Sequence, residues 1–359
     1  MFKVKNRSNM EVVIHEVYEE GYSITVNGNG GKPLLWNPYR DYLMSAKKNT
    51  SSASCELIPT GISSLDKALG GGLKAGLYVV GANPGAGKTS LLLHILSNIS
   101  QDGKPSLFFS LDMSDIQTTI RLMANASYKF SELDNLTIND LSDLKAILSD
   151  DELRNKVNKT GEFFNQQILP YVSVLSAHTD GVGKIDDTIT YVESIEVALK
   201  NYKQYHNCNP VVVVDFLQLL QNKPVSSYRD EYDREIFLKS FDKRIEMDKI
   251  VEKLKKYSTT YNVPIIVITS TNRSSYSKLN EYNPDSEYDI SFSKESGNIE
   301  YLADVLIRLT PGESTTNFGG PEQECVNLHI VKSRFGKAHL TIPLNFIPEY
   351  AFFSEVTND

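Results

Sequence analysis

The sequence predicts an α/β fold in which a mostly parallel central sheet is flanked by helices. Two observations support this prediction. Short, fully apolar runs of β-prone residues alternate with stretches of helical periodicity, which is the pattern that builds a parallel sheet. A glycine-rich loop also stands directly between one such strand and one such helix. The chain has 359 residues, and we expect a short N-terminal extension over residues 1–50 and an α/β domain over residues 51–359.

The N-terminal extension differs from the rest of the chain. Two β-prone runs, residues 12–14 and 22–26, flank a turn at Gly21 and predict a small β element. The single tryptophan, Trp36, lies in an apolar cluster. This cluster either docks on a neighbouring subunit or packs on its own domain, and the sequence leaves both possibilities open. The polar stretch over residues 47–54 is the expected linker.

The glycine-rich loop over residues 82–89 reads ANPGAGKT and matches the Walker A pattern, with Ala82 in place of the usual first glycine. An apolar strand over residues 77–80 precedes the loop and a helix starting near Ser90 follows it, and this context makes the match credible. Glycines let the backbone curl so that successive N–H groups point at phosphate oxygens, and the helix dipole favours the same anion. The loop therefore predicts a site for ATP with Mg²⁺. We expect the nucleotide to contact Asn83, Pro84, Gly85, Ala86, Gly87, Lys88, Thr89 and Ser90.

Two acidic residues follow apolar strands at their carboxyl ends. Asp215 ends a run of four valines, which is the Walker B pattern. We expect Asp215 and the Thr89 hydroxyl to hold Mg²⁺ while Lys88 reaches the β- and γ-phosphates. Asp112 follows the strand over residues 106–111. Its position suits either an acid that orients an attacking water or an ordinary acid at the start of the next helix.

Further strands and helices follow from the same patterns. Residues 264–269 form another apolar strand, and residues 326–331 and 339–344 predict a C-terminal β-hairpin. A long helix is expected from about residue 234 to residue 257, and residues 141–148 fit one amphipathic helix.

Composition limits the classes of function. With 37 basic and 45 acidic residues the net charge is −8, which argues against an open basic surface for duplex DNA but not against a local basic channel. The three cysteines, Cys55, Cys208 and Cys325, have no metal-like spacing and indicate a reduced, cytoplasmic protein. No signal peptide or apolar run of membrane-spanning length is present in the sequence, so we expect no membrane partner.

Taken together, these segments resemble the C-terminal motor domain of the DnaB-type replicative helicases, within the RecA-like ATPases. The resemblance implies a RecA-like P-loop NTPase fold and an ATP-hydrolysing ring, a homo-oligomer and in this family a hexamer, that translocates on single-stranded DNA. A loader or another replication or recombination protein is the further partner that it implies. In chain order it is carried by residues 58–66, 82–89, 108–114, 215–219, 262–273, 294–304 and 332–336.

The resemblance also implies roles for individual residues. Asp112 matches the catalytic acid, Arg121 matches an arginine near the γ-phosphate, and Ser270 stands where the family carries a γ-phosphate-sensing glutamine. Lys332 and Arg334 match a pair that reaches into the nucleotide site of the neighbouring subunit. The family's contacts to single-stranded DNA fall on Arg273, Lys294, Glu295 and Gly297.

Three departures from the family pattern are visible. A short, dissimilar stretch precedes the motor domain where the family carries a large helical domain, the catalytic acid is Asp112 rather than Glu, and Ser270 replaces Gln. An aspartate is one methylene shorter, and a 1 Å misplacement can cost roughly 100-fold in rate. The departures leave room for two alternatives. One is a RecA-like DNA-dependent ATPase that acts as a loader, recombination mediator or mobile-element or defence component without helicase action. The other is a nucleotide-binding structural protein.

Overall fold

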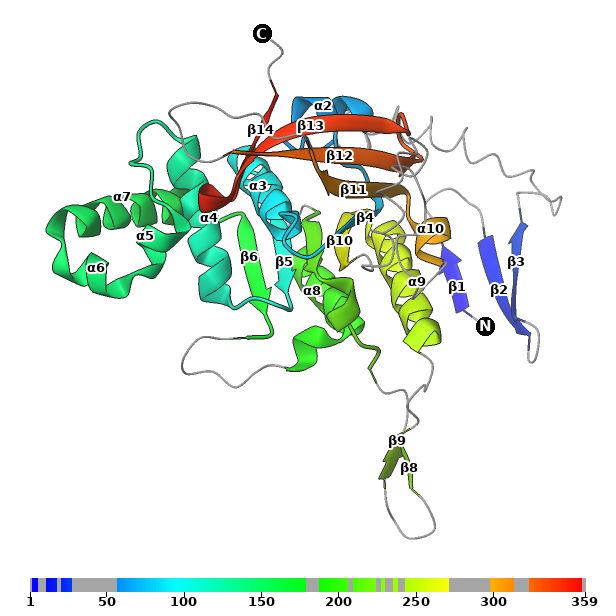
Figure 1. Ribbon diagram of the computed structural model, residues 1–359. Helices are drawn as coiled ribbons and strands as arrows, with labels where there is room; N and C mark the ends of the chain where they lie inside the picture. Colours follow the sequence, from blue (N-terminus) through cyan, green and yellow to red (C-terminus); the bar gives the residue numbers. More distant parts are fainter. Residues whose placement is uncertain are drawn as a thin grey trace. The chain divides into compact units, whose positions relative to one another are not determined.

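The computed structural model places a nine-stranded sheet at the centre of the larger part of the chain (Figure 1). The structure describes residues 2–5, 11–17, 21–27, 57–178, 187–205, 209–223, 227–229, 235–237, 243–270, 298–312 and 323–356. These residues fall into two compact units, Met1–Glu56 and Leu57–Asp359. The first unit holds an antiparallel sheet of β1 (Phe2–Lys5), β2 (Glu11–Val17) and β3 (Gly21–Asn27). Trp36 and the expected linker lie outside the described residues.

The sheet of the second unit has the strand order β14-β13-β12-β11-β4-β10-β7-β5-β6. The strands from β11 to β6 pair in parallel, whereas β12, β13 and β14 are antiparallel. The predicted α/β fold with a C-terminal hairpin is thus confirmed. The strands are β4 (Gly76–Ala82), β5 (Ser106–Ser110), β6 (Val172–Ser176), β7 (Val211–Asp215), β10 (Pro264–Ser270), β11 (Val305–Pro311), β12 (Glu324–Ser333), β13 (Leu340–Ile347) and β14 (Phe352–Glu355).

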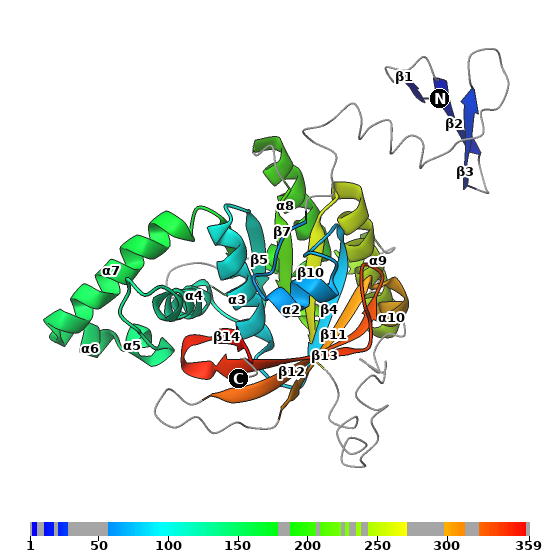
Figure 2. The same ribbon diagram turned by 90° about the horizontal axis from the view of Figure 1, so that it is seen from above.

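Helices cover both faces of this sheet (Figure 2). The α-helices are α2 (Ser63–Ala68), α3 (Lys88–Gln101), α4 (Asp115–Lys129), α5 (Ile138–Ser142), α6 (Leu144–Ser149), α7 (Asp151–Gln167), α8 (Val192–Tyr205), α9 (Lys243–Tyr261) and α10 (Asn298–Leu302). Short 3₁₀ turns are η1 (Asp187–Thr190), η2 (Leu217–Leu219) and η5 (Pro348–Tyr350).

Two apolar cores result from the alternation of side chains along the strands. Tyr78 and Val80 of β4 face the core beneath α2, α3 and α4, whereas Leu77 and Val79 face the core beneath α8, α9 and α10. Successive side chains of a strand point to opposite faces, so a fully apolar strand such as β4 must be covered on both. The run of valines in β7 is buried for the same reason.

Two predicted helices differ from the observed elements. The long helix expected from residue 234 starts only at Lys243, and the residues Glu235–Phe237 instead form the strand β9, which pairs with β8 (Ser227–Arg229). The single helix predicted over residues 141–148 is split in two at Asp143. The Asp143 carboxylate accepts hydrogen bonds from Lys145 N and Ala146 N, and such a cap starts a new helix.

Parallel pairing brings the carboxyl ends of four strands to one edge of the sheet. In the register of the strands, Ser110 of β5 lies opposite Asp215 of β7, and Ser270 of β10 lies opposite Ala82 of β4. This edge is where ligands bind in open α/β sheets. Residues that the sequence places far apart therefore meet at the end of the strand that leads into the glycine-rich loop.

Helix α3 carries a buried histidine, His94, beside the C-terminal strand β14. Asn125 Nδ2 lies 3.1 Å from His94 Nδ1, and the ring of Phe352 packs edge-on at 4.9 Å between centroids. Burial lowers the pKa of His94 from 6.5 to about 3, and the charge of Lys129 acts in the same direction. The folded protein therefore keeps this imidazole neutral at pH values where the unfolded chain protonates it.

Acid is expected to destabilise the fold through His94. Because the folded pKa is lower than the unfolded value, the free energy of unfolding falls as the pH drops from 6.5 towards 3, by about 1.4 kcal/mol per pH unit for this group. A His94→Gln variant should lose this part of the slope. Urea unfolding at pH 7 and pH 5 measures the change in the free energy of unfolding for the wild type and for the variant. An equal change in both proteins would show that His94 does not cause the pH dependence.

Candidate nucleotide site

The glycine-rich loop connects β4 to α3 and has the backbone that phosphate binding needs. Gly85 and Gly87 both have φ of +81°, in the left-handed region that favours glycine. Gly87 is the N-cap of α3 and supplies no side-chain cap, so the first N–H groups of the helix have no side-chain acceptor of that kind. A Cβ added to Gly87 would lie 3.2 Å from the Phe346 ring. The loop is thus an open cradle backed by the C-terminal hairpin.

Lys88 folds back over this cradle. Its Nζ donates hydrogen bonds to Ala82 O at 2.9 Å and to Asn83 O at 2.7 Å. Burial lowers the pKa of Lys88, and the nearby Asp215 carboxylate opposes that shift. The ammonium group is therefore held at the mouth of the loop, where a phosphate oxygen is a stronger acceptor than the two carbonyls.

Thr89 and Asp215 form a direct pair from two different elements. Thr89 Oγ1, in the first turn of α3, donates to Asp215 Oδ2 at the end of β7 over 2.6 Å. Asp215 is only 4% exposed. Burial raises the pKa of Asp215, Asp112 adds to this, and the Thr89 hydrogen bond, Lys88 and Arg121 oppose it. Asp215 thus interacts with four other residues that were singled out in the sequence, namely Thr89, Lys88, Asp112 and Arg121.

The oxygen pair of Thr89 and Asp215 fits Mg²⁺. Magnesium prefers oxygen ligands and is usually held by one or two carboxylates while keeping several waters and phosphate oxygens. Among the described residues, no group of three or more His, Cys, Asp or Glu is arranged to hold a metal ion. A sparse hydroxyl and carboxylate pair beside a phosphate loop is therefore the expected donor set.

Asp112 lies on the loop between β5 and α4, with an exposed side chain. The loop itself is held in place. The hydroxyls of Ser110 and Ser176 donate to Met113 O at 2.7 and 2.9 Å, and Leu111 N donates to Asp215 O at 2.7 Å. The sequence analysis missed the two serines. Their only local signal is that each is the last residue of its strand.

Arg121 lies on α4, and Ser270 lies at the carboxyl end of β10. Arg121 is half-buried on α4, and its Nη1 donates to Gln117 O at 3.4 Å. Ser270 ends β10 and contacts a residue that the sequence analysis overlooked. Gln218 Nε2 donates to Thr269 Oγ1 at 2.9 Å and to Ser270 O at 3.3 Å. Gln218 follows Asp215 by three positions, so its place in the Walker B segment could have identified it as a candidate site residue.

Lys332 lies near the end of β12 and Arg334 in the turn between β12 and β13, and both contact α10. Arg334 Nη1 donates to Asp304 Oδ1 at 3.0 Å and its Nη2 to Tyr301 O at 2.9 Å. Lys332 Nζ donates to Glu300 O at 2.5 Å and to Tyr301 O at 3.2 Å. Within one chain these cations therefore contact α10 and Asp304, which lies between α10 and β11. The expected DNA contacts at Arg273, Lys294, Glu295 and Gly297 lie outside the described residues.

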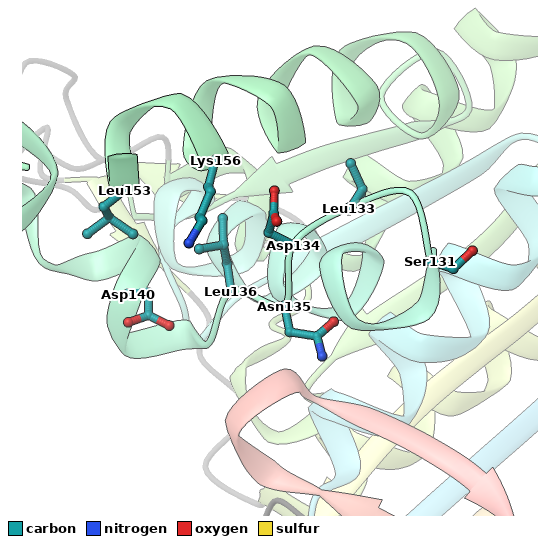
Figure 3. A pocket seen from close by; sticks show the side chains of 8 residues that line it. All are labelled: Ser131, Leu133, Asp134, Asn135, Leu136, Asp140, Leu153 and Lys156. Atoms are coloured by element: carbon teal, nitrogen blue, oxygen red, sulfur yellow. The ribbon is translucent and has the colours of Figure 1, made fainter. Parts of the chain in front are cut away.

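A separate cavity of about 560 Å³ is lined by the segment over residues 131–136, which follows α4, and by residues of α5 and α7 (Figure 3). Asp134 and Asp140 line it together with Lys156. None of the residues singled out in the sequence lines this cavity. Two carboxylates at its wall make it a poor match for an anionic nucleotide.

Within the part of the chain that the structure describes, no helix combines the length and the apolar character that crossing a bilayer requires.

Comparisons with known proteins agree with this geometry. A family model described as the DnaB-like helicase C terminal domain matches residues 58–355. The replicative DNA helicase DnaB of Helicobacter pylori (strain ATCC 700392 / 26695) is 26% identical over 270 residues, covering 75% of this chain and 47% of that protein. A probable replicative DNA helicase of Trieres chinensis is 26% identical over 326 residues, covering 89% of this chain and 62% of that protein. The DnaB protein of Geobacillus stearothermophilus is 27% identical over 298 residues, covering 82% and 56%. The chain thus spans about half the length of these curated relatives.

Solved structures show the same fold. A solved ATPase domain superposes with a TM-score of 0.64 at 20% identity and covers 90% of this chain and 100% of that one. A DnaB-like replicative helicase, solved in a study of its interactions with primase, superposes with a TM-score of 0.63 at 22% identity and covers 88% and 68%. The glycine-rich loop and the Thr89–Asp215 pair both lie inside residues 58–355, the region that the family model matches. The chain belongs to the family of DnaB-like helicase C-terminal domains.

Proposed function

We propose that the protein is an ATP-hydrolysing ring motor of the DnaB type that translocates on single-stranded DNA. The observation that carries this proposal is the Thr89–Asp215 hydrogen bond of 2.6 Å beside Lys88 and the glycine loop. It joins the two Walker motifs, 126 residues apart, into one site. The curated relatives that this chain matches are named replicative or probable replicative DNA helicases. The widely spaced cysteines support a cytoplasmic setting.

In this proposal the chain's own residues position the triphosphate and the attacking water. The loop N–H groups and Lys88 bind the β- and γ-phosphates, and Thr89 and Asp215 would hold Mg²⁺. The ion, when bound, neutralises charge on the phosphates. Asp112 orients the attacking water and accepts its proton. Arg121 on α4 and Ser270 at the end of β10 would contact the γ-phosphate.

The assembly is part of the proposal. Arg334 and Lys332 contact α10 of their own chain, and they would complete the site of the neighbouring subunit in a homo-oligomer, a hexamer by family resemblance. Single-stranded DNA would run along Arg273, Lys294, Glu295 and Gly297 in the centre of the ring. A basic lining of this kind is compatible with the net charge of −8, because phosphate contacts depend on where the charges lie. A loader or another replication or recombination protein remains the expected further partner.

A second candidate function keeps the hydrolysis of ATP but does not separate the strands of duplex DNA. Asp112 and Ser270 are shorter than the family's Glu and Gln, which favours a RecA-like DNA-dependent ATPase that works as a loader or recombination mediator. The two proposals agree on ATP hydrolysis stimulated by DNA. Displacement of a labelled strand from a forked duplex distinguishes them.

ATP hydrolysis with and without single-stranded DNA tests the shared core of both proposals. Lys88→Ala should lower the turnover roughly 10²- to 10³-fold, because it removes a charged donor aimed at the transferring phosphoryl group. Lys145→Ala, which alters an exposed lysine on α6, is the matched control and should leave turnover unchanged. Turnover that is insensitive to DNA would contradict the motor. Lys88→Ala with full activity would contradict the site.

A further inference from the structure

Asp304 is a buried carboxylate whose contacts come from three parts of the fold. It is 3% exposed and stands between α10 and β11. Its Oδ2 accepts hydrogen bonds from Leu77 N of β4 at 2.8 Å and from Lys255 Nζ of α9 at 2.6 Å, and its Oδ1 accepts from Arg334 Nη1 at 3.0 Å. Burial acts to raise the pKa of Asp304, but the hydrogen bonds from Lys255, Leu77 and Arg334 hold it below its usual value. The group is therefore an anion with a full set of donors.

The two oxygens of Asp304 serve different partners. Oδ2 joins elements of the sheet and of α9 within the core, and this is a structural contact. Oδ1 is directed at Arg334, whose side chain is 48% exposed. Oδ1 thus fixes the position of a side chain that is otherwise half-exposed to solvent.

The backbone around Arg334 is also fixed. Arg334 N donates to Asp304 O at 2.9 Å, and Lys337 N donates to Ala68 O at 3.1 Å at the end of α2. Arg334 Nη2 donates to Tyr301 O at 2.9 Å. The turn is thus attached at both ends, and the direction of the guanidinium depends on Asp304 Oδ1 and Tyr301 O.

The guanidinium has more donors than these two acceptors use. An arginine side chain has five N–H donors in a planar fork, and among the described residues Asp304 and Tyr301 engage Nη1 and Nη2 with one contact each. Arg334 can therefore stay on its anchor while its remaining N–H groups meet a phosphate. A fixed fork loses less conformational freedom when it binds, and this preorganisation strengthens binding.

We infer that Asp304 is a positioning residue for Arg334, holding the guanidinium in the orientation in which it reaches the nucleotide of the neighbouring subunit. The inference rests on the proposed function, since it requires a site shared between subunits. Asp304 itself does not touch the nucleotide. Asp304 of one subunit therefore affects the nucleotide site of the neighbouring subunit through Arg334, and not the site of its own subunit. This difference between the two sites can be tested.

Mixed oligomers separate the two sites of each subunit. A Lys88→Ala chain has a disabled site of its own but carries Arg334, whereas an Arg334→Ala chain has an intact Walker site but lacks the arginine. Mixing them should restore ATP turnover at the interfaces where Arg334 of the first chain faces the site of the second. A mixture with no more activity than its parents would refute the shared site itself, and the inference would fall with it.

Asp304→Asn is then placed in either chain of the mixture. In the Lys88→Ala chain it should lower the restored turnover at least about tenfold, because that chain supplies the arginine. In the Arg334→Ala chain it should leave the restored turnover unchanged. Equal losses in both placements would show a merely structural role, and no loss in either would show that Arg334 needs no anchor. Both results overturn the inference.

A second variant controls for folding. Asp304→Asn leaves the Lys255 ammonium without its carboxylate, so we pair it with Lys255→Met, which removes that charge and keeps an apolar side chain of similar length. The double variant should recover the thermal midpoint of the wild type and still show the loss in one placement only. If the double variant recovered both the thermal midpoint and the turnover, the lost turnover would be due to the unpaired Lys255 ammonium. That result would overturn the inference.

Discussion

Arg334→Ala is expected to lower ATP turnover by roughly 10³- to 10⁵-fold, the range found when an arginine supplied by a partner is absent from a phosphoryl-transfer site. Nucleotide binding should change little, because Lys88 and the loop lie on another part of the chain. Steady-state hydrolysis and the affinity for a fluorescent nucleotide measure the two effects separately. Lys337→Ala, an exposed cation of the same turn, is the matched control and should keep full turnover.

The same substitution, combined with Lys88→Ala, shows whether the site is shared between subunits. When chains that carry both substitutions are mixed into wild-type oligomers, turnover should fall more steeply than the fraction of wild-type chains. Each doubly substituted chain has a disabled site of its own and also withholds the arginine from a neighbour whose own Walker residues are intact. A strictly linear loss would mean that every chain works alone, and Arg334 would then be an ordinary surface cation held by Asp304.

The arrangement of Lys88, Thr89 and Asp215 around the glycine-rich loop was largely predictable because these residues lie in local patterns. The loop, Lys88 and Thr89 are contiguous in the sequence, and the position of Asp215 follows from a fully apolar strand that must be buried between helices. Parallel pairing then brings Asp215 and Thr89 together across 126 residues. These steps need only strand and helix patterns and the rule that carboxyl ends share one edge.

The residues that the sequence analysis missed act through contacts between distant segments. Asp304 receives its hydrogen bond from Leu77 across 227 residues, and Ser176 reaches Met113 across 63. A serine or aspartate at the end of a strand looks the same whether it faces solvent or holds a neighbouring loop. Such roles depend on the order of strands in the sheet, and this order is a property of the whole fold.

The predicted bounds of two helices were wrong for a related reason. Apolar spacing before Lys243 fits a helix, yet the residues Glu235–Phe237 pair with β8, because pairing with another segment can override local propensity. At Asp143 the spacing of leucines continues through a capping residue. Leu144 and Leu148 are 70% and 73% exposed, so the apolar spacing across the cap did not reflect a common buried face.

Asp112→Asn carries the second large effect. Removing a positioned acid that orients water and accepts its proton should lower turnover by roughly 10²- to 10⁴-fold. The loss should appear in kcat and not in KM, since Asp112 lies between β5 and α4 and is not part of the glycine-rich loop between β4 and α3. The anchoring of its loop by Ser110, Ser176 and Asp215 keeps the rest of the site in place, so the amide should change the chemistry alone.

Asp115→Asn is the matched control for this substitution. Asp115 stands three positions later, and among the described residues its carboxylate accepts a local hydrogen bond from Ile116 N at 2.8 Å, so this variant should keep full turnover. Asp112→Glu restores the carboxylate and extends it by one methylene, and it should recover most of the lost rate. An Asp112→Asn protein as active as the wild type would identify Asp112 as an ordinary acid at the start of α4. The acid that prepares the water would then have to be sought elsewhere at this edge of the sheet.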